Sequence, residues 1–139
     1  MRTTERWWPE PEAGLFVWCR FPDIAALSPG PKPRPALIII VFDDEAPRLR
    51  VRCAYGTSQK VRELRAGEFA VTPADGTAFG LSGLSYPTKF DLGRAVELPY
   101  CTPWFDVPPA APLGQSPRLG VLHPALTRRV AAAWRAVHV

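Results

Sequence analysis

Prolines divide this chain into short segments, because 17 of its 139 residues are proline. Proline fixes its own φ angle and lacks an amide hydrogen, so it interrupts helices and is kept out of the middle of sheets. Its abundance argues against long helices and favours short strands joined by irregular loops. The length and the 47% hydrophobic content are typical of one globular domain with its own core, and we expect a single domain over residues 1–139.

Apolar and alternating patterns predict six short strands. The expected strands are residues 14–21, 35–42, 48–56, 68–72, 88–98 and 118–122. Residues 35–42 are almost continuously apolar and β-branched, which is typical of a central strand covered on both faces. The connections at 22–34, 75–85 and 103–117 are rich in proline, glycine or polar residues and predict loops.

Helical periodicity is confined to the end of the chain. Pro124 suits a first helical position, and one face carries Leu126, Val130, Trp134 and Val137. We expect this helix to pack on the core rather than to bind a partner. The sequence therefore predicts a mainly β fold, in which a small twisted sheet curls into a barrel beside a C-terminal helix.

The positive charge is concentrated near the C-terminus. The net charge is +4, all 13 acidic residues precede residue 107, and the excess is carried by Arg118, Arg128, Arg129 and Arg135. Two interpretations stay open: a contact with nucleic acid or an acidic partner, and a solvated helix face whose cations lie near the negative end of the helix dipole.

The cysteines are widely spaced and odd in number, at Cys19, Cys53 and Cys101. Without a C-x-x-C pair, they predict buried free thiols in a reducing compartment. The first residues lack an apolar signal core, and no segment approaches the roughly 20 apolar residues of a membrane span. We expect a cytoplasmic protein without a membrane segment, a metal or a cofactor.

Hairpin geometry brings the start of the strand at 35–42 close to the end of the strand at 48–56, where polar side chains lie. If strands 35–42 and 48–56 pair around the acidic turn at 43–47, one face combines apolar residues in the pairs Phe42–Leu49, Ile40–Val51, Ile38–Cys53 and Ala36–Tyr55. The next pair on that face is Arg34 with Thr57, with Cβ atoms roughly 5 Å apart. An arginine fork and a hydroxyl at the rim of a core suit the binding of a phosphodiester.

A second pair of interest is Lys89 and Asp91, which point to the same face of a strand. Cutting RNA through its own 2′-hydroxyl requires a base, an acid and a cation that stabilises the phosphorane. Lys89 and Asp91 could supply the acid and the base, or form a surface pair without catalytic meaning. His123 and His138 lie outside these segments, which argues against a histidine-based nuclease.

Several of these segments together resemble PemK/MazF-type toxins. The resemblance rests on the strand at 14–21, the block Lys32-Pro33-Arg34-Pro35-Ala36-Leu37-Ile38, the strand end Tyr55-Gly56-Thr57-Ser58, and Pro117–Leu122 before the final helix. It covers residues 14–137 and leaves 1–13 as an N-terminal extension. It implies an SH3-like small barrel of the Kid/MazF/CcdB type, usually a homodimer, that cleaves single-stranded RNA without metal and is bound by a cognate antitoxin protein.

The resemblance also implies roles for individual residues. Arg34 corresponds to the arginine that stabilises the scissile phosphate, Thr57 to the hydroxyl beside it, and Lys89-x-Asp91 to an Arg-x-Asp acid–base pair in which lysine replaces arginine. The neighbouring residues expected to bind RNA are Lys32, Ser58, Gln59 and Lys60.

Two other functions stay open at this point. One is a non-catalytic barrel that binds an antitoxin peptide or a DNA-topology enzyme. The other is an adaptor for proline-rich peptides, which would need Trp7, Trp8, Trp18 and Tyr55 to form a groove.

Overall fold

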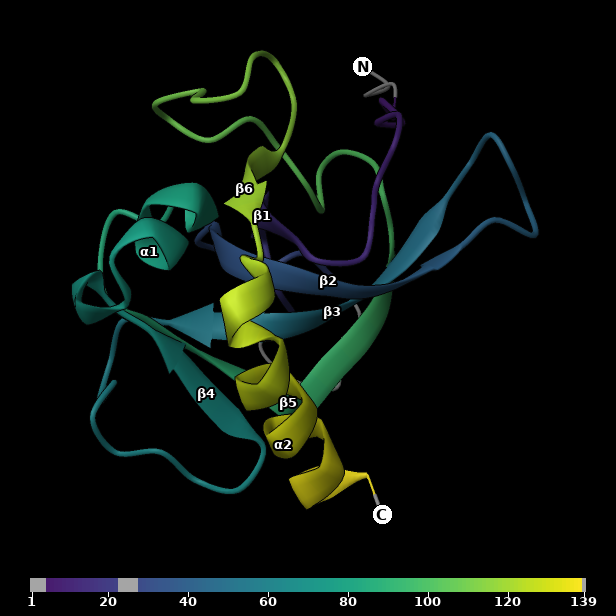
Figure 1. The fold of residues 1–139 in the computed structure, drawn as a ribbon. Helices are drawn as coiled ribbons and strands as arrows, with labels where there is room; N and C mark the ends of the chain where they lie inside the picture. The colour runs from purple at the N-terminus through teal and green to yellow at the C-terminus, as the bar shows by residue number, and fades with distance from the viewer. Residues whose placement is uncertain (1–4, 23–27, 139) are drawn as a thin grey trace.

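The computed structural model describes residues 5–22 and 28–138. These residues form one antiparallel sheet of six strands in the order β4-β5-β3-β2-β1-β6. The strands are β1 (Leu15–Cys19), β2 (Arg34–Phe42), β3 (Arg50–Thr57), β4 (Glu68–Val71), β5 (Thr88–Pro99) and β6 (Arg118–Val121). The sheet curls into a half-barrel, and the C-terminal helix α2 (Thr127–Val137) lies across it (Figure 1). The predicted mainly β fold with a terminal helix is confirmed.

The loop predicted over 75–85 is wrong, because this region contains helices. A 3₁₀ turn, η1 (Pro73–Asp75), leads into α1 (Thr77–Ser82). The Asp75 carboxylate accepts a hydrogen bond from the Thr72 amide at 2.8 Å, which satisfies an amide at the start of η1. Gly83 ends α1 in the left-handed region at φ +71°. Another 3₁₀ turn, η2 (Pro124–Leu126), precedes α2.

Both faces of the central strands are buried, so the sheet carries two apolar clusters. Ala36 and Ile38 of β2 lie in one cluster and Leu37 lies in the other, as the alternation of a strand requires. The first cluster is closed by Trp8, Tyr100 and Phe105 from segments outside the strands. The second includes Leu126 and Ala133, against which Val130 and Trp134 also pack. The predicted apolar face thus packs on the core, except at its end, where Val137 is 36% exposed.

The β2–β3 hairpin keeps the predicted register at one end and loses it at the other. Ala36 pairs with Tyr55 and Ile38 with Cys53, as the sequence predicted. A bulge at Ile39 then shifts the register, so that Ile40 pairs with Arg52 and Phe42 with Arg50. The predicted pairs Ile40–Val51 and Phe42–Leu49 are therefore wrong, and Ile40 is 37% exposed.

The long strand β5 bends where it passes from one neighbour to the next. Its pairing with β3 jumps from Ala54–Ala95 to Tyr55–Asp91, which leaves residues 92–94 outside the ladder. Beyond this bend, β5 pairs with both β3 and β4, with Asp91 opposite Glu68 on the β4 side. The bend turns β4 and the start of β5 around the end of β3, and so contributes to the curl of the sheet.

The segment before β1 packs on the core instead of extending away from it. Trp7 forms a β-bridge with Cys101, and the buried Trp8 indole donates a hydrogen bond to the Phe105 carbonyl at 2.9 Å. Because Trp8 is only 3% exposed, it is removed from any aromatic groove of the adaptor type.

Other expectations concern the cysteines, the first loop and membrane spans. Cys19, Cys53 and Cys101 are free and buried, as predicted, and burial raises the pKa of the Cys19 thiol well above its ordinary value.

Of the predicted loop at 22–34, residues 23–27 lie outside the described residues. No helix within the described ranges has the length and apolar character needed to cross a membrane.

Candidate functional site

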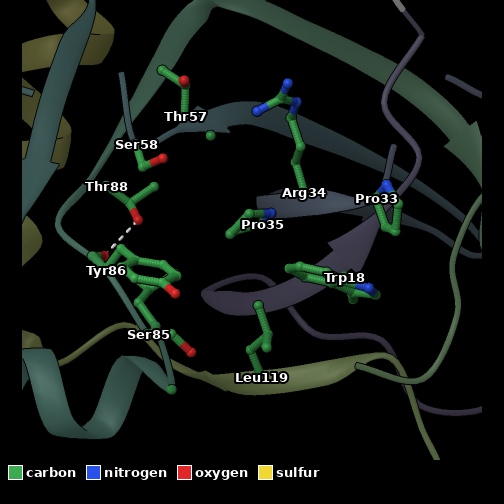
Figure 2. Close-up of a pocket in the computed structure, with 13 residues that line it drawn as sticks. Trp18, Pro33, Arg34, Pro35, Thr57, Ser58, Ser85, Tyr86, Thr88 and Leu119 are labelled. Atoms are coloured by element: carbon green, nitrogen blue, oxygen red, sulfur yellow. Dashed lines mark hydrogen bonds between the residues drawn. The ribbon is translucent and has the colours of Figure 1, made fainter. Parts of the chain in front are cut away.

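A pocket of about 200 Å³ opens where β2 begins and β3 ends, and we call it the first pocket (Figure 2). Segments far apart in the chain meet here: β1, the loop before β2, the end of β3, the turn after α1, the start of β5 and β6. Its lining consists of Trp18, Pro33, Arg34, Pro35, Gly56, Thr57, Ser58, Gly83, Leu84, Ser85, Tyr86, Thr88 and Leu119.

Arg34 is fixed in place by its neighbours in the sequence and across the sheet. It is the first residue of β2, lies between Pro33 and Pro35, and pairs with Cys19 of β1. Its side chain is half-buried, and its guanidinium carbon lies 6.0 Å from the centre of the Tyr55 ring. The guanidinium carbon of Arg94 lies over the same ring, 4.4 Å from its centre, so two cations lie near one aromatic ring.

Thr57 ends β3, two residues beyond the Ala36–Tyr55 pair, and lies at the same end of the pocket as Arg34 (Figure 2). The β2–β3 ladder ends at Ala36–Tyr55, so the predicted pairing of Arg34 with Thr57 is not part of it. Its hydroxyl oxygen accepts a hydrogen bond from the Gln59 amide at 3.1 Å. A hydroxyl both donates and accepts, so this bond orients the oxygen and leaves its hydrogen for a ligand.

The other hydroxyl groups lie along one wall, opposite Trp18 and Pro35 (Figure 2). The Thr88 hydroxyl donates to the Tyr86 carbonyl at 2.8 Å, and this bond holds the turn before β5. Ser58, Ser85 and Tyr86 are exposed at the mouth. Arg34 supplies the charge among the described lining residues, and no carboxylate lies among them. One cation surrounded by hydroxyl donors suits an anion such as a phosphate group.

A larger, second pocket of about 1200 Å³ adjoins the first, and both are lined by Ser58 and Tyr86. The rest of its lining consists of Lys60, Val61, Arg62, Glu63, Thr72, Pro73, Ala74 and Pro87. On the other side of Arg34, a small recess of about 50 Å³ also contains Lys32 and Arg94.

The structure brings together part of the site predicted from the sequence. Arg34, Thr57 and Ser58 line the first pocket. Lys32 shares the small recess with Arg34, and Lys60 lies in the second pocket. Gln59 is exposed in the loop between Ser58 and Lys60. These positions are therefore divided among the first pocket, the two cavities that share residues with it, and the loop after β3.

Lys89 and Asp91 lie outside the linings of these three cavities, although both belong to the strand next to Thr57. Lys89 is 8% exposed, and its amine donates to the Glu68 carboxylate at 3.1 Å and to the Glu63 carbonyl at 2.9 Å. The Asp91 carboxylate accepts a hydrogen bond from the Gly93 amide at 2.8 Å. The lysine is thus engaged with groups of the loop before β4 and of β4 itself.

Several lining residues were missed by the sequence analysis, among them Ser85, Tyr86 and Thr88, and Trp18 was named only for the groove of a peptide adaptor. The segment 85–88 reaches the site because β5 pairs antiparallel with β3, with Lys89 opposite Thr57. That pairing joins residues more than 30 positions apart, so no local pattern predicts it. The turn residues before the expected strand at 88–98 were the available signal.

No group of three or more His, Cys, Asp or Glu side chains that could hold a metal ion occurs among the residues with described positions. A scan against models of protein families finds no match to this chain, and a search of curated proteins finds no significant similarity.

Proposed function

We propose that this protein is an endoribonuclease that cuts single-stranded RNA without metal, built on an SH3-like barrel of the PemK/MazF toxin type. The observation that carries the proposal is the first pocket, in which Arg34 and Thr57 line the same end, beside a wall of hydroxyl groups. Free buried cysteines are in keeping with action in a reducing cytoplasm.

In the proposed reaction, the 2′-oxygen of RNA attacks the adjacent phosphorus and its proton is released. The bond to the 5′-oxygen of the next nucleotide breaks, and that oxygen takes up a proton, leaving a 2′,3′-cyclic phosphate and a 5′-hydroxyl end. Arg34 neutralises the charge that grows on the phosphorane oxygens, and the Thr57 hydroxyl donates a hydrogen bond to one of them. In a pocket partly shielded from water these contacts are worth more than in bulk solvent.

The acid–base roles proposed for Lys89 and Asp91 have weaker support than the roles of Arg34 and Thr57. Lys89 would have to leave the Glu68 carboxylate and the Glu63 carbonyl to reach a substrate in the first pocket. Electrostatic stabilisation by Arg34 and Thr57 is therefore the main contribution that we propose. Lys32, Ser58, Gln59 and Lys60 would contact the RNA on either side of the scissile phosphate.

The experiment is incubation of the purified protein with a long single-stranded RNA in excess EDTA. We expect cuts at discrete sites by the wild type, none by Arg34→Ala, and partial activity in Arg34→Lys, which keeps the charge but loses the bidentate fork. Arg48→Ala is the matched control, because it removes an equal charge from the exposed turn between β2 and β3, outside the linings of the three cavities. Full cleavage by Arg34→Ala would refute the proposal.

A second candidate is a non-catalytic module on the same fold, which binds an antitoxin peptide or a DNA-topology enzyme. It is favoured by one observation: the amine of Lys89 is held by Glu68, and the first pocket, over its described lining, contains no carboxylate or imidazole base. A folded wild type that leaves RNA intact at high protein concentration would support this candidate.

The proposed toxin would have two protein partners, a second copy of itself and a cognate antitoxin. An antitoxin segment that occupies the first pocket would exclude RNA from it. Sedimentation of the protein alone tests the dimer, and loss of RNA cleavage on addition of the candidate antitoxin tests the competition.

A further inference from the structure

The second pocket has the size, position and chemistry to hold more of an RNA than its phosphate. We propose that it is a base-binding subsite, which receives the base of a nucleotide next to the scissile phosphate and stacks it on Tyr86. This inference rests on the proposed function, because it takes the first pocket as the place of the phosphate. It adds the place at which the protein recognises the bases of the sequence that it cuts.

The sizes of the two cavities separate their roles. The first pocket measures about 200 Å³, below the roughly 300–1,000 Å³ of small-molecule sites. It has room for a phosphate and the edge of its ribose, but a whole nucleotide would exceed it. The second pocket measures about 1200 Å³, which is above this range and leaves room for a whole nucleotide. It begins at the shared residues Ser58 and Tyr86. A nucleotide whose phosphate lies on Arg34 can therefore place a neighbouring base there.

Tyr86 is the residue best suited to take up that base. It is 69% exposed although its ring is large, and it lines both pockets. Its backbone is fixed, because its carbonyl accepts the hydrogen bond from the Thr88 hydroxyl. An exposed aromatic ring on a fixed turn is a stacking platform, and stacking of one base is worth about tenfold to a hundredfold in affinity.

The remaining lining fits a base with its attached sugar and phosphate. Val61, Pro73 and Pro87 supply apolar surface for the faces of a ring. Lys60 and Arg62 are cations, against the single carboxylate of Glu63, so the pocket favours a polyanion. An RNA strand that passes Arg34 meets these cations next, and this continuity favours RNA over an uncharged peptide.

The test uses Ala74→Trp, which places a large side chain in the second pocket from the exposed surface of η1. Ala74 does not line the first pocket, so the phosphate contacts remain. Ala110→Trp, at an exposed position outside both linings, is the matched control. Binding is measured by fluorescence anisotropy with a 2′-O-methyl oligonucleotide, which cannot be cut, and cleavage sites are mapped on a long RNA.

We expect Ala74→Trp to weaken oligonucleotide binding at least tenfold and to change the base preferred beside the cut, whereas Ala110→Trp leaves both unchanged. Tyr86→Ala should have the same effects and Tyr86→Phe should retain wild-type binding, because phenylalanine preserves the stacking surface. Circular dichroism melting of each variant establishes that it is folded.

Two results would overturn the inference: unchanged binding and cleavage preference in folded Ala74→Trp and Tyr86→Ala, or binding of an apolar peptide but no oligonucleotide by the wild type. Failure of the proposed function is recognised separately. If the folded wild type cuts no RNA but binds the oligonucleotide, and Ala74→Trp loses that binding, the base subsite stands and the nuclease proposal falls.

Discussion

The amine of Lys89 lies 3.1 Å from a carboxylate oxygen of Glu68, and both side chains are 10% exposed. The same carboxylate oxygen accepts a hydrogen bond from the Arg65 amide at 2.7 Å. The pair therefore ties β5 to β4 and to the loop before β4, close to the second pocket. A charge in such surroundings is stable only while its partner is present.

We expect Lys89→Met to lower the free energy of unfolding by about 3 kcal/mol, because it leaves the Glu68 carboxylate buried without its cation. The double variant Lys89→Met/Glu68→Leu should regain most of this loss, since neither charge then remains. Urea denaturation measures both values. Unchanged stability of Lys89→Met together with loss of RNA cleavage would contradict this structural role and identify Lys89 as a catalytic acid.

Removal of the Thr57 hydroxyl should impair cleavage without unfolding the protein. Thr57→Val keeps the shape of the side chain but deletes the hydrogen bond proposed for the phosphorane, so we expect cleavage to slow about 100-fold. Thr57→Ser keeps the hydroxyl and should retain most of the activity. Single-turnover cleavage rates provide the measurement, and equal rates for the wild type and Thr57→Val would remove Thr57 from the mechanism.

The contact between Asp75 and Arg129 makes part of the stability depend on pH. The Arg129 guanidinium donates to both Asp75 carboxylate oxygens, at 3.0 and 3.1 Å, and holds the pKa of that carboxyl below its ordinary value of 3.8. Because the folded-state pKa is the lower one, this stabilisation is present at neutral pH and is lost as the pH falls through it.

Asp75→Asn should therefore cost about 1 kcal/mol of unfolding free energy at pH 7, and its stability should converge with that of the wild type in acid. Arg135→Ala, on the exposed surface of the same helix, is the control and should change little. Urea denaturation over a series of pH values tests this, and a constant difference at every pH would contradict it.

The two glycines of the α1 region should respond to alanine in opposite ways. A Cβ on Gly83 would lie 1.9 Å from the Leu119 carbonyl oxygen, at a φ of +71°. Gly83→Ala should thus destabilise the protein by about 3 kcal/mol and distort the first pocket, which both residues line. Gly80→Ala meets nothing within 4 Å and should stabilise α1 by about 0.5 kcal/mol. Thermal melts of the wild type and the two variants at equal protein concentration measure both changes. Melting temperatures that shift in the same direction would contradict the prediction.

The sequence allowed prediction of the parts of the fold that are set by local pattern. The six strands appear near their expected positions, because apolar runs and turn residues act over a few neighbours. The helix α1 was missed because its few residues, two of them glycine or serine, give no apolar stripe. Its signals were Thr72 three residues before Asp75, and the terminating Gly83.

In the candidate site, too, the residues placed by local pattern could be predicted and those placed by long-range strand pairing could not. Arg34 and Thr57 could be brought together by counting along one hairpin, because the register near Ala36 and Tyr55 is set by buried side chains. The wall at residues 85–88 depends on the pairing of β3 with β5, which joins distant segments. Lys89 is buried beside Glu68 because β4 pairs with β5. The alternation of side chains along β5 predicts the face on which Lys89 lies, but it cannot identify Glu68 as the partner, because β4 is a separate segment of the chain.

The bulge at Ile39 divides the β2–β3 hairpin into a part beside the first pocket and a part that ends in an exposed turn. The pairs between the bulge and the first pocket, such as Ala36–Tyr55 and Ile38–Cys53, are anchored in the core, whereas residues 43–48 are exposed. A residue added within this exposed turn lies in solvent and leaves those pairs in place. The turn is the place at which this protein can accept a tag, a linker or a fluorescent label while the pairs beside the first pocket are preserved.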